Sequence, residues 1–204
     1  MDRTTSTTST TASTTAASTE TRAPTSTGLG MPRIDTQLRF EGAFAFRDAP
    51  WLKLTDQEPI VYRLRVLANG GRAFRRIRRA TGVDDLGVLG IGESGRGRSR
   101  LRDFWKAAAG EARSHRAGRD FAWYEFGEVF GLDLLRVEFV RLGSKDLAEA
   151  VEAALIEEYR SDFKDRPPLN GSSGKVRKVV RWLEGLGRRA RDDDGWLDLS
   201  GLLP

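Results

Sequence analysis

The sequence predicts an α+β fold, in which a small β-sheet is flanked by helices. Short segments rich in β-branched residues, bounded by Pro, Gly and Asn, indicate strands. Other segments place apolar residues three and four positions apart, which is typical of amphipathic helices. The first 35 residues are nearly all Thr, Ser and Ala, and we expect them to form a disordered tail because they cannot build a core.

Strands are expected at residues 38–46, 60–66, 87–91 and 134–142. A helix is expected after Ser94-Gly95, since Leu101, Phe104, Trp105 and Ala108 share one helical face. Residues 121–130 are ambiguous and favour a helix. Ser144 is a suitable N-cap for a helix that runs to about Tyr159. A last amphipathic helix is expected at residues 175–191, with four apolar residues facing inward: Val176, Val179, Val180 and Leu183.

These elements divide the chain into three parts: a tail (1–35), a central domain (36–174), and a basic helix with a C-terminal extension (175–204). Met31 is an alternative start, because the composition changes there. The N-terminus has no apolar segment of the signal-peptide kind, and no apolar run approaches the ~20 residues of a membrane span. We therefore expect a cytoplasmic protein without membrane contact.

The composition limits the chemistry that this chain can perform. Lys and Arg number 34 against 29 Asp and Glu, which gives a formal net charge of +5 and a pI near 9.9. This balance suits a polyanionic partner, although many basic proteins never bind nucleic acid. The chain has no cysteine and one histidine, which excludes thiolate chemistry and makes a histidine-built metal site implausible. Any metal must be held mainly by oxygen, which favours Mg²⁺ or Mn²⁺.

Four short segments occur in a fixed order and place polar groups on different elements. They are Pro59-Ile60-Val61-Tyr62; Gly90-Ile91-Gly92-Glu93-Ser94 leading to Arg100; residues 151–159, which include Glu152; and Pro167-Pro168-Leu169-Asn170. Together they supply a tyrosine, an arginine, a carboxylate and an amide, the groups that a metal-assisted phosphodiesterase uses.

In this order the segments resemble the GIY-YIG nuclease superfamily, over roughly residues 59–170. The resemblance implies a small mixed three-stranded sheet flanked by helices, and a divalent-metal-dependent DNA endonuclease that uses Mg²⁺ or Mn²⁺. RNA stays open as a substrate, as does a requirement for a homodimer or a specificity partner.

The resemblance assigns a role to each matching residue. Glu152 would hold the metal ion, Tyr62 would act on the attacking water, and Arg100 would hold the scissile phosphate. Asn170 would brace the tyrosine or the phosphate. His115 follows the first helix, where some members carry a histidine, and would contact nucleic acid.

Each of these residues also has a purely structural interpretation. Tyr62 could be a strand tyrosine at a sheet edge, Arg100 a solvated arginine and Asn170 a turn residue. Glu152 could be a salt-bridged helix residue, and His115 a surface residue. Glu152 lies on a largely apolar helix face, where a carboxylate costs free energy unless it is paired or metal-bound.

Three positions depart from the family pattern and put activity in doubt. Gly90 replaces the tyrosine of the second motif, Glu93 stands where some members carry a lysine, and Phe104 where some carry another tyrosine. The alternatives are a catalytically inactive module of the same fold that binds nucleic acid, and a protein-interaction module that docks a partner through Trp182 or Trp196.

Backbone contacts to nucleic acid are expected from exposed arginines, which would position the substrate without reading its sequence. The candidates cluster in two stretches: Arg72, Arg75, Arg76, Arg78 and Arg79, and then Arg96 and Arg98. Each could equally be an ordinary solvated residue.

Overall fold

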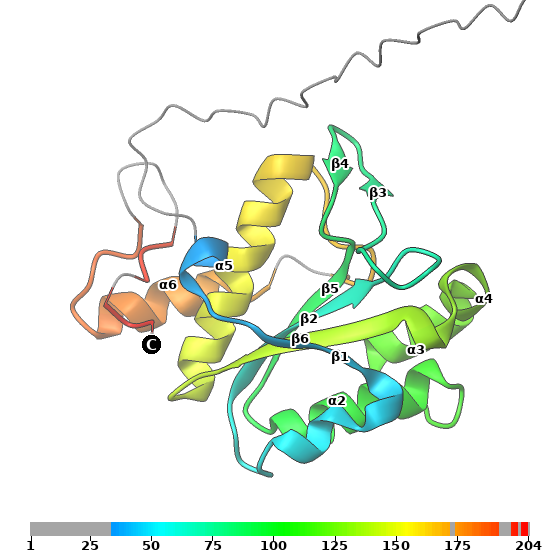
Figure 1. Ribbon diagram of the computed structural model, residues 1–204. Helices are drawn as coiled ribbons and strands as arrows, with labels where there is room; N and C mark the ends of the chain where they lie inside the picture. Colours follow the sequence, from blue (N-terminus) through cyan, green and yellow to red (C-terminus); the bar gives the residue numbers. More distant parts are fainter. Residues whose placement is uncertain (1–33, 172–173, 192–196, 200, 204) are drawn as a thin grey trace, which may run out of the picture. The chain divides into compact units, whose positions relative to one another are not determined.

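A four-stranded antiparallel sheet forms the centre of the fold (Figure 1). The computed structural model describes residues 34–171, 174–191, 197–199 and 201–203. The strands are β1 (Glu41–Ala45), β2 (Ile60–Val66), β5 (Val88–Ser94) and β6 (Leu135–Arg141), in the spatial order β1-β6-β2-β5. The α+β class is confirmed. The expected mixed three-stranded sheet is wrong, because β1 adds a fourth strand to β6 and every pairing is antiparallel.

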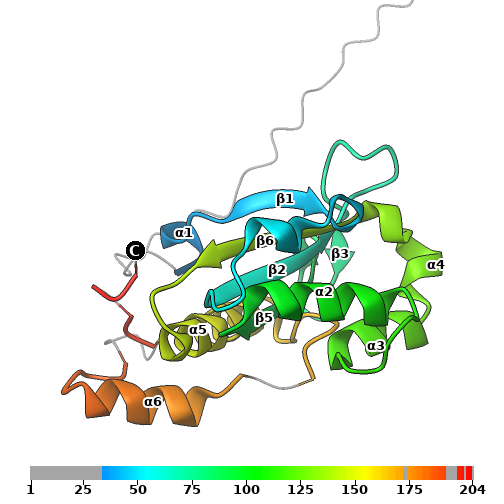
Figure 2. The ribbon, with the colours of Figure 1, turned by 90° about the horizontal axis from the view of Figure 1, so that it is seen from below.

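Helices cover both faces of the sheet (Figures 1 and 2). One face packs against α5 (Lys145–Phe163), with Val61, Val88 and Val140 supplied by the strands, and α6 (Val176–Gly185) packs in turn against α5 and extends the same core. The other face packs against α2 (Gly97–Ala108) and α3 (Arg116–Trp123), with Leu64, Leu89 and Val137 supplied by the strands. Every second residue of β2 (Ile60, Tyr62, Leu64 and Val66) belongs to the α2-side core, as the period of a strand requires, whereas Val61 belongs to the α5-side core.

The predicted helices are present with shifted ends. Ser144 caps α5 as expected, since its Oγ accepts a hydrogen bond from the amide of Leu147 at 3.1 Å. The ambiguous stretch is helical but broken: α3 ends before Glu125, whose φ of 54° stops the helix, and α4 spans Phe126–Phe130. The last helix ends at Gly185 and not at residue 191.

Smaller elements complete the fold. A hairpin of β3 (Ile77–Arg78) and β4 (Val83–Asp84) contains part of the basic stretch. Three 3-10 helices are η1 (Phe46–Asp48), η2 (Pro50–Lys53) and η3 (Leu132–Leu134). No helix within the described ranges is long and apolar enough to cross a membrane.

The sequence predicts a disordered tail at residues 1–35 and a separate C-terminal part at residues 175–204. Residues 1–33 lie outside the described residues. Ile34 and Asp35 already belong to α1 (Ile34–Gln37), and the amide of buried Ile34 donates to Glu158 Oε1 at 2.6 Å. At the other end, Val179 and Leu183 of α6 are buried in the same core as α5, and Met31–Pro204 forms one compact unit.

Candidate active site

The candidate site lies along β5, which is an edge strand of the sheet. Tyr62 on β2 is paired with Gly92 on β5, and its side chain is only 2% exposed. A Cβ atom at Gly92 would lie 2.5 Å from both Oη and Cζ of Tyr62. The tyrosine therefore crosses β5 directly over Gly92, and only a glycine leaves room for the ring.

The Tyr62 hydroxyl lies within the electrostatic reach of three charged side chains. Burial raises its pKa most strongly; Arg100 on α2 opposes the rise by its charge and by hydrogen bonding, whereas Glu152 and Glu93 add to it. The net pKa is above the ordinary value of 10.0, so Tyr62 is a neutral phenol at neutral pH. Tyr62, Arg100 and Glu152, which the sequence predicted as site residues, thus come together in space.

Two carboxylates meet on the α5 side of this edge. Glu152 has a pKa raised to about 7, first by burial and then by the negative charge of Glu93. The Glu93 side chain is 13% exposed, and its buried Oε2 has no hydrogen-bond partner within the described part of the chain. Glu93, which the sequence marked as a departure, therefore lies beside the predicted metal ligand.

The lysine that immediately precedes α6 completes the cluster. Lys175 Nζ lies 3.3 Å from Glu93 Oε1 and 2.9 Å from Glu149 Oε1. Lys178 Nζ lies 2.5 Å from the other oxygen of Glu149. Sequence reasoning missed Lys175 and Glu149, although a lysine at the start of a helix, against the helix dipole, is an unusual choice that could have drawn attention to it.

The donor set fits a hard divalent cation. Glu93 and Glu152 offer carboxylate oxygens, one of which is buried and has no partner among the described side chains and main-chain groups. Such oxygens are the ligands that Mg²⁺ and Mn²⁺ prefer. Within the part of the chain that the structure describes, no group of three or more His, Cys, Asp or Glu side chains could hold a metal ion. The remaining ligands would have to come from water and substrate phosphate.

Asn170 takes a different position from the one expected. Its Oδ1 accepts from the amide of Ile91 at 2.8 Å, and its Nδ2 donates to the carbonyl of the same residue at 2.7 Å. The Leu169 amide donates to the Leu89 carbonyl at 2.7 Å. The expected bracing of Tyr62 is therefore not seen, because the Asn170 amide is bound to the main chain of β5.

The segment that contains Leu169 and Asn170 also explains why position 90 is a glycine. A Cβ atom at Gly90 would lie 3.3 Å from Leu169 Cβ and 3.5 Å from Leu64 Cδ1. Leu169 is buried, 6% exposed, and occupies the space beside this strand position. A tyrosine at position 90 would need that space. In this chain the buried side chain of Leu169 fills it instead.

His115 is not a surface contact, contrary to the prediction. It is 2% exposed, and its Nδ1 accepts from the amide of Gly118 at 3.3 Å, which caps α3. Its ring packs edge-on against Phe104 with centroids 5.3 Å apart, and its buried Nε2 has no hydrogen-bond partner within residues 34–171 or the other described segments. Burial, followed by the charge of Arg100, lowers its pKa to about 3, so the imidazole is neutral.

The predicted nucleic-acid arginines differ in availability. Arg72, Arg76, Arg78 and Arg96 are exposed, and Arg75 and Arg98 are half-buried. Arg75 lies over the Phe130 ring, Arg76 pairs with Asp85 at 2.5 Å, and Arg98 lies 3.7 Å from Asp56. Arg79 is the exception: its side chain is 10% exposed and is held by Asp165 and by the Arg166 carbonyl.

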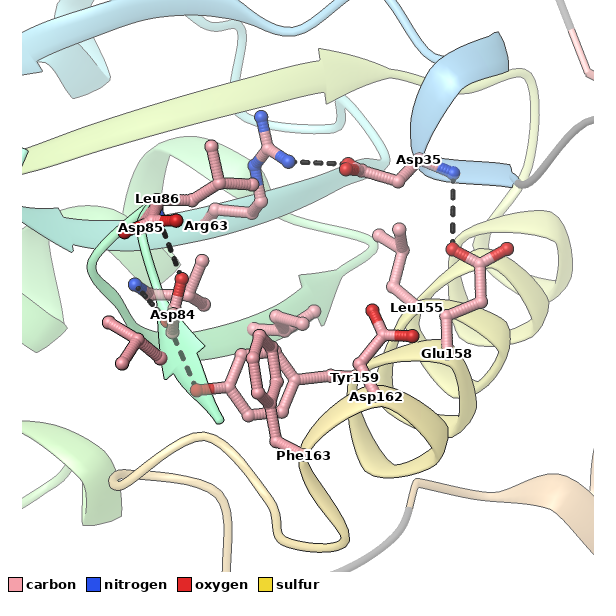
Figure 3. Close-up of a pocket in the computed structure, with 13 residues that line it drawn as sticks. Asp35, Arg63, Asp84, Asp85, Leu86, Leu155, Glu158, Tyr159, Asp162 and Phe163 are labelled. Carbon is pink, nitrogen blue, oxygen red and sulfur yellow. Dashed lines mark hydrogen bonds and ion pairs between the residues drawn. The ribbon is translucent and has the colours of Figure 1, made fainter. Parts of the chain in front are cut away.

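A separate pocket of about 290 Å³ lies between β4 and α5 (Figure 3). Its carboxylates are engaged: Asp35 pairs with Arg63 at 2.5 Å, and Glu158 accepts from the amide of Ile34. Asp84 accepts from three main-chain amides and from the Tyr159 hydroxyl. The residues that line it include none of the predicted site residues, so this pocket is distinct from the candidate site.

Searches of protein-family models, of curated proteins and of solved structures found no match to this chain.

Trp196, a docking residue of the protein-interaction alternative, lies outside the described residues, and Trp182 packs half-buried against the α5–α6 core.

Proposed function

We propose that this chain is a divalent-metal-dependent endonuclease of the GIY-YIG type that hydrolyses phosphodiester bonds in DNA. The observation that supports this proposal is the convergence of Tyr62, Arg100, Glu93 and Glu152 at the edge of β5, where each side chain perturbs the ionisation of another. Titratable groups coupled in this way are concentrated at functional sites.

Each residue has a role that follows from its position. Glu152 and Glu93 hold the cation through carboxylate oxygens, and Arg100, which is exposed, contacts the scissile phosphate. A bound divalent cation supplies Lewis-acid polarisation of the phosphate and stabilises the leaving oxygen. Tyr62 orients the attacking water as a neutral phenol, because a phenolate beside two carboxylates is disfavoured until their charge is neutralised.

The second candidate function is nucleic-acid binding without hydrolysis by the same fold. The raised pKa of Tyr62 favours this alternative, since a general base is most effective when its pKa lies near the working pH. It predicts retention of DNA in a gel-shift assay with no cut product. RNA as substrate, a homodimer and a cytoplasmic location stay predictions.

The test is nicking of supercoiled plasmid by the full chain with Mg²⁺ or Mn²⁺, beside an EDTA control. Glu152→Gln keeps the shape of the side chain and removes its charge, and we expect it to lower the nicking rate by at least about 100-fold, as expected when the group that holds the catalytic metal is lost. Glu157→Gln is the matched control, because Glu157 lies on the same helix and pairs with Arg191.

Loss of nicking in Glu152→Gln alone would support the proposal. Equal inertness of the folded wild type and both variants with either metal would overturn hydrolysis of DNA, and the same proteins in a gel-shift assay would then test the binding alternative. Single-stranded RNA in parallel reactions distinguishes the two polymers.

A further inference from the structure

The start of α6 carries cations where a helix favours anions. Lys175 is the residue before the helix, and Arg177 and Lys178 follow in its first turn, which holds no acidic residue. Ammonium groups at this end oppose the positive pole of the helix dipole. Lys175 at the N-cap makes no capping hydrogen bond with its side chain either. A sequence that breaks a local preference in this way meets another requirement at that position.

That requirement is the negative charge of carboxylates on the neighbouring elements α5 and β5. Glu149 of α5 is 2% exposed, so its carboxylate needs cationic partners, and it has three: Lys175 at 2.9 Å and Lys145 at 3.7 Å on Oε1, and Lys178 at 2.5 Å on Oε2. Lys178 lies in addition 3.5 Å from Asp146. Lys175 is shared between Glu149 and the Glu93 carboxylate on β5.

The lysines satisfy only part of the hydrogen-bonding capacity of the Glu93 carboxylate. Its Oε1 contacts Lys175 at 3.3 Å, whereas Oε2 is buried and has no hydrogen-bond partner among the residues that the structure describes. An ionised carboxylate can accept about four hydrogen bonds, so Glu93 retains unused capacity. The Lys175 side chain is 48% exposed, so its ammonium can leave Glu93 and be hydrated by the surrounding water.

We propose that the Lys175 ammonium is the resident counter-ion of the Glu93–Glu152 pair, and that a divalent cation must displace it from Glu93. This inference rests on the proposed function in one respect, that a cation enters between these two carboxylates. Both positive charges compete for the same oxygens, whereas Glu149 keeps Lys178 when Lys175 departs. Lys175 thus sets how readily the site takes up metal, and links α6 to metal occupancy.

The experiment measures the Kd of Mn²⁺ for the full chain without DNA, from the EPR signal of the free ion. Wild type is compared with Lys175→Met, which keeps the aliphatic stem, and with Lys178→Met, which removes the same charge three residues further along. We expect Lys175→Met to bind Mn²⁺ on the order of fivefold more tightly, the scale of a surface ion pair. Lys178→Met should stay within about twofold of wild type, since Lys178 contacts Glu149 and Asp146.

Addition of Glu93→Gln to Lys175→Met should abolish the gain, which ties the competition to Glu93. Equal gains in the two lysine variants would overturn the inference, since they would report a general charge effect. Unchanged or weaker binding by folded Lys175→Met would overturn it too, as would the lack of measurable binding by all proteins. Displacement of Lys175 by Mn²⁺ without any nicking of plasmid would uphold the inference and remove the endonuclease proposal.

Discussion

Two glycines of β5 show how a missing side chain shapes the candidate site. Gly92 leaves the space that the Tyr62 ring crosses, and Gly90 lies beside Leu169 and Leu64. At neither position is a positive φ the reason for glycine; a close approach of neighbouring atoms is. The first glycine supports the site directly, and the second allows the segment after α5 to lie against the strand.

We predict that Gly92→Ala displaces Tyr62 and lowers activity. The new Cβ would lie 2.5 Å from two Tyr62 atoms, and overpacking of this kind costs about 1–3 kcal/mol in the free energy of unfolding. Misplacement of a reacting group by about 1 Å lowers the rate by about 100-fold, which the plasmid assay would detect. Gly143→Ala is the control, because its Cβ would meet no atom within 4 Å. An unchanged stability and rate in Gly92→Ala would contradict the described packing.

The single histidine predicts how stability depends on pH. The pKa of His115 is about 3 in the folded protein and 6.5 when unfolded, so below pH 6.5 the unfolded chain binds the additional proton. His115 therefore lowers stability as pH falls, by about 2 kcal/mol at pH 5. Glu152 acts in the opposite direction between its unfolded value of 4.5 and about 7, since the folded protein holds that proton.

Comparison with His115→Asn isolates the histidine, because the Glu152 contribution is common to both proteins. Asn retains an acceptor for the Gly118 amide and does not titrate. Chemical denaturation at pH 7 and pH 5 should show that wild type loses about 2 kcal/mol relative to the variant. A constant difference between the two proteins would show that His115 is not held neutral by burial.

At the scale of elements, residues 167–170 act as a short cover for the edge of β5. The Leu169 amide and both ends of the Asn170 side chain bind main-chain groups of β5, at Leu89 and Ile91. An edge strand otherwise leaves such groups unpaired. This segment therefore fixes the strand that carries Gly92 and Glu93.

We predict that Asn170→Ala loosens β5 without a direct effect on the chemistry. Loss of the two hydrogen bonds should cost about 1–3 kcal/mol, and the Ile91 amide should exchange its hydrogen faster. Hydrogen exchange followed by NMR measures this amide directly, and the amide of Leu64 on β2 serves as the internal reference. Unchanged exchange at Ile91 together with a large loss of nicking would instead assign Asn170 to the substrate.

Periodicity and capping made several elements predictable, because both depend on neighbours in the sequence. The helix that begins after Ser144 and the strand at residues 60–66 are of this kind. The break at Glu125 was not predictable, since a positive φ at glutamate has no local signal. The place of β1 beside β6 was missed in the expected sheet because that pairing joins segments nearly 100 residues apart.

The candidate site was likewise predictable where short motifs carry it, and not where it depends on contacts between distant segments. Motif spacing selected Tyr62, Arg100 and Glu152, which lie close enough to shift one another's pKa. The contact between Glu93 and Lys175 spans 82 residues, and no motif contains it. Burial decided the remaining cases: His115 and Arg79 are charged or polar residues that sequence alone places at the surface.

At the scale of the whole molecule, the net charge of +5 matters for binding only where cations are free to meet phosphates. Arg72 and Arg78 are exposed on the segment that leads into and through β3. Arg79, the next residue, is turned to the protein, where Asp165 and the Arg166 carbonyl hold its guanidinium. Adjacent arginines of one basic stretch therefore have different surroundings.

We predict that the salt dependence of DNA binding distinguishes the exposed arginines from Arg79. The double substitution Arg72→Ala/Arg78→Ala should reduce the slope of log Kd against log salt for duplex DNA by up to about 2, since each lost phosphate contact removes about 0.9. Its unfolding free energy should change by less than about 0.5 kcal/mol, as for other surface substitutions. Arg79→Ala should keep the slope and lower the unfolding free energy instead, because Asp165 and the Arg166 carbonyl lose their partner. Filter binding between about 50 and 200 mM salt, with denaturation of the same samples, measures both quantities. A reduced slope in Arg79→Ala at unchanged stability would show that Arg79 leaves its ion pair to bind DNA, and would return it to the nucleic-acid surface.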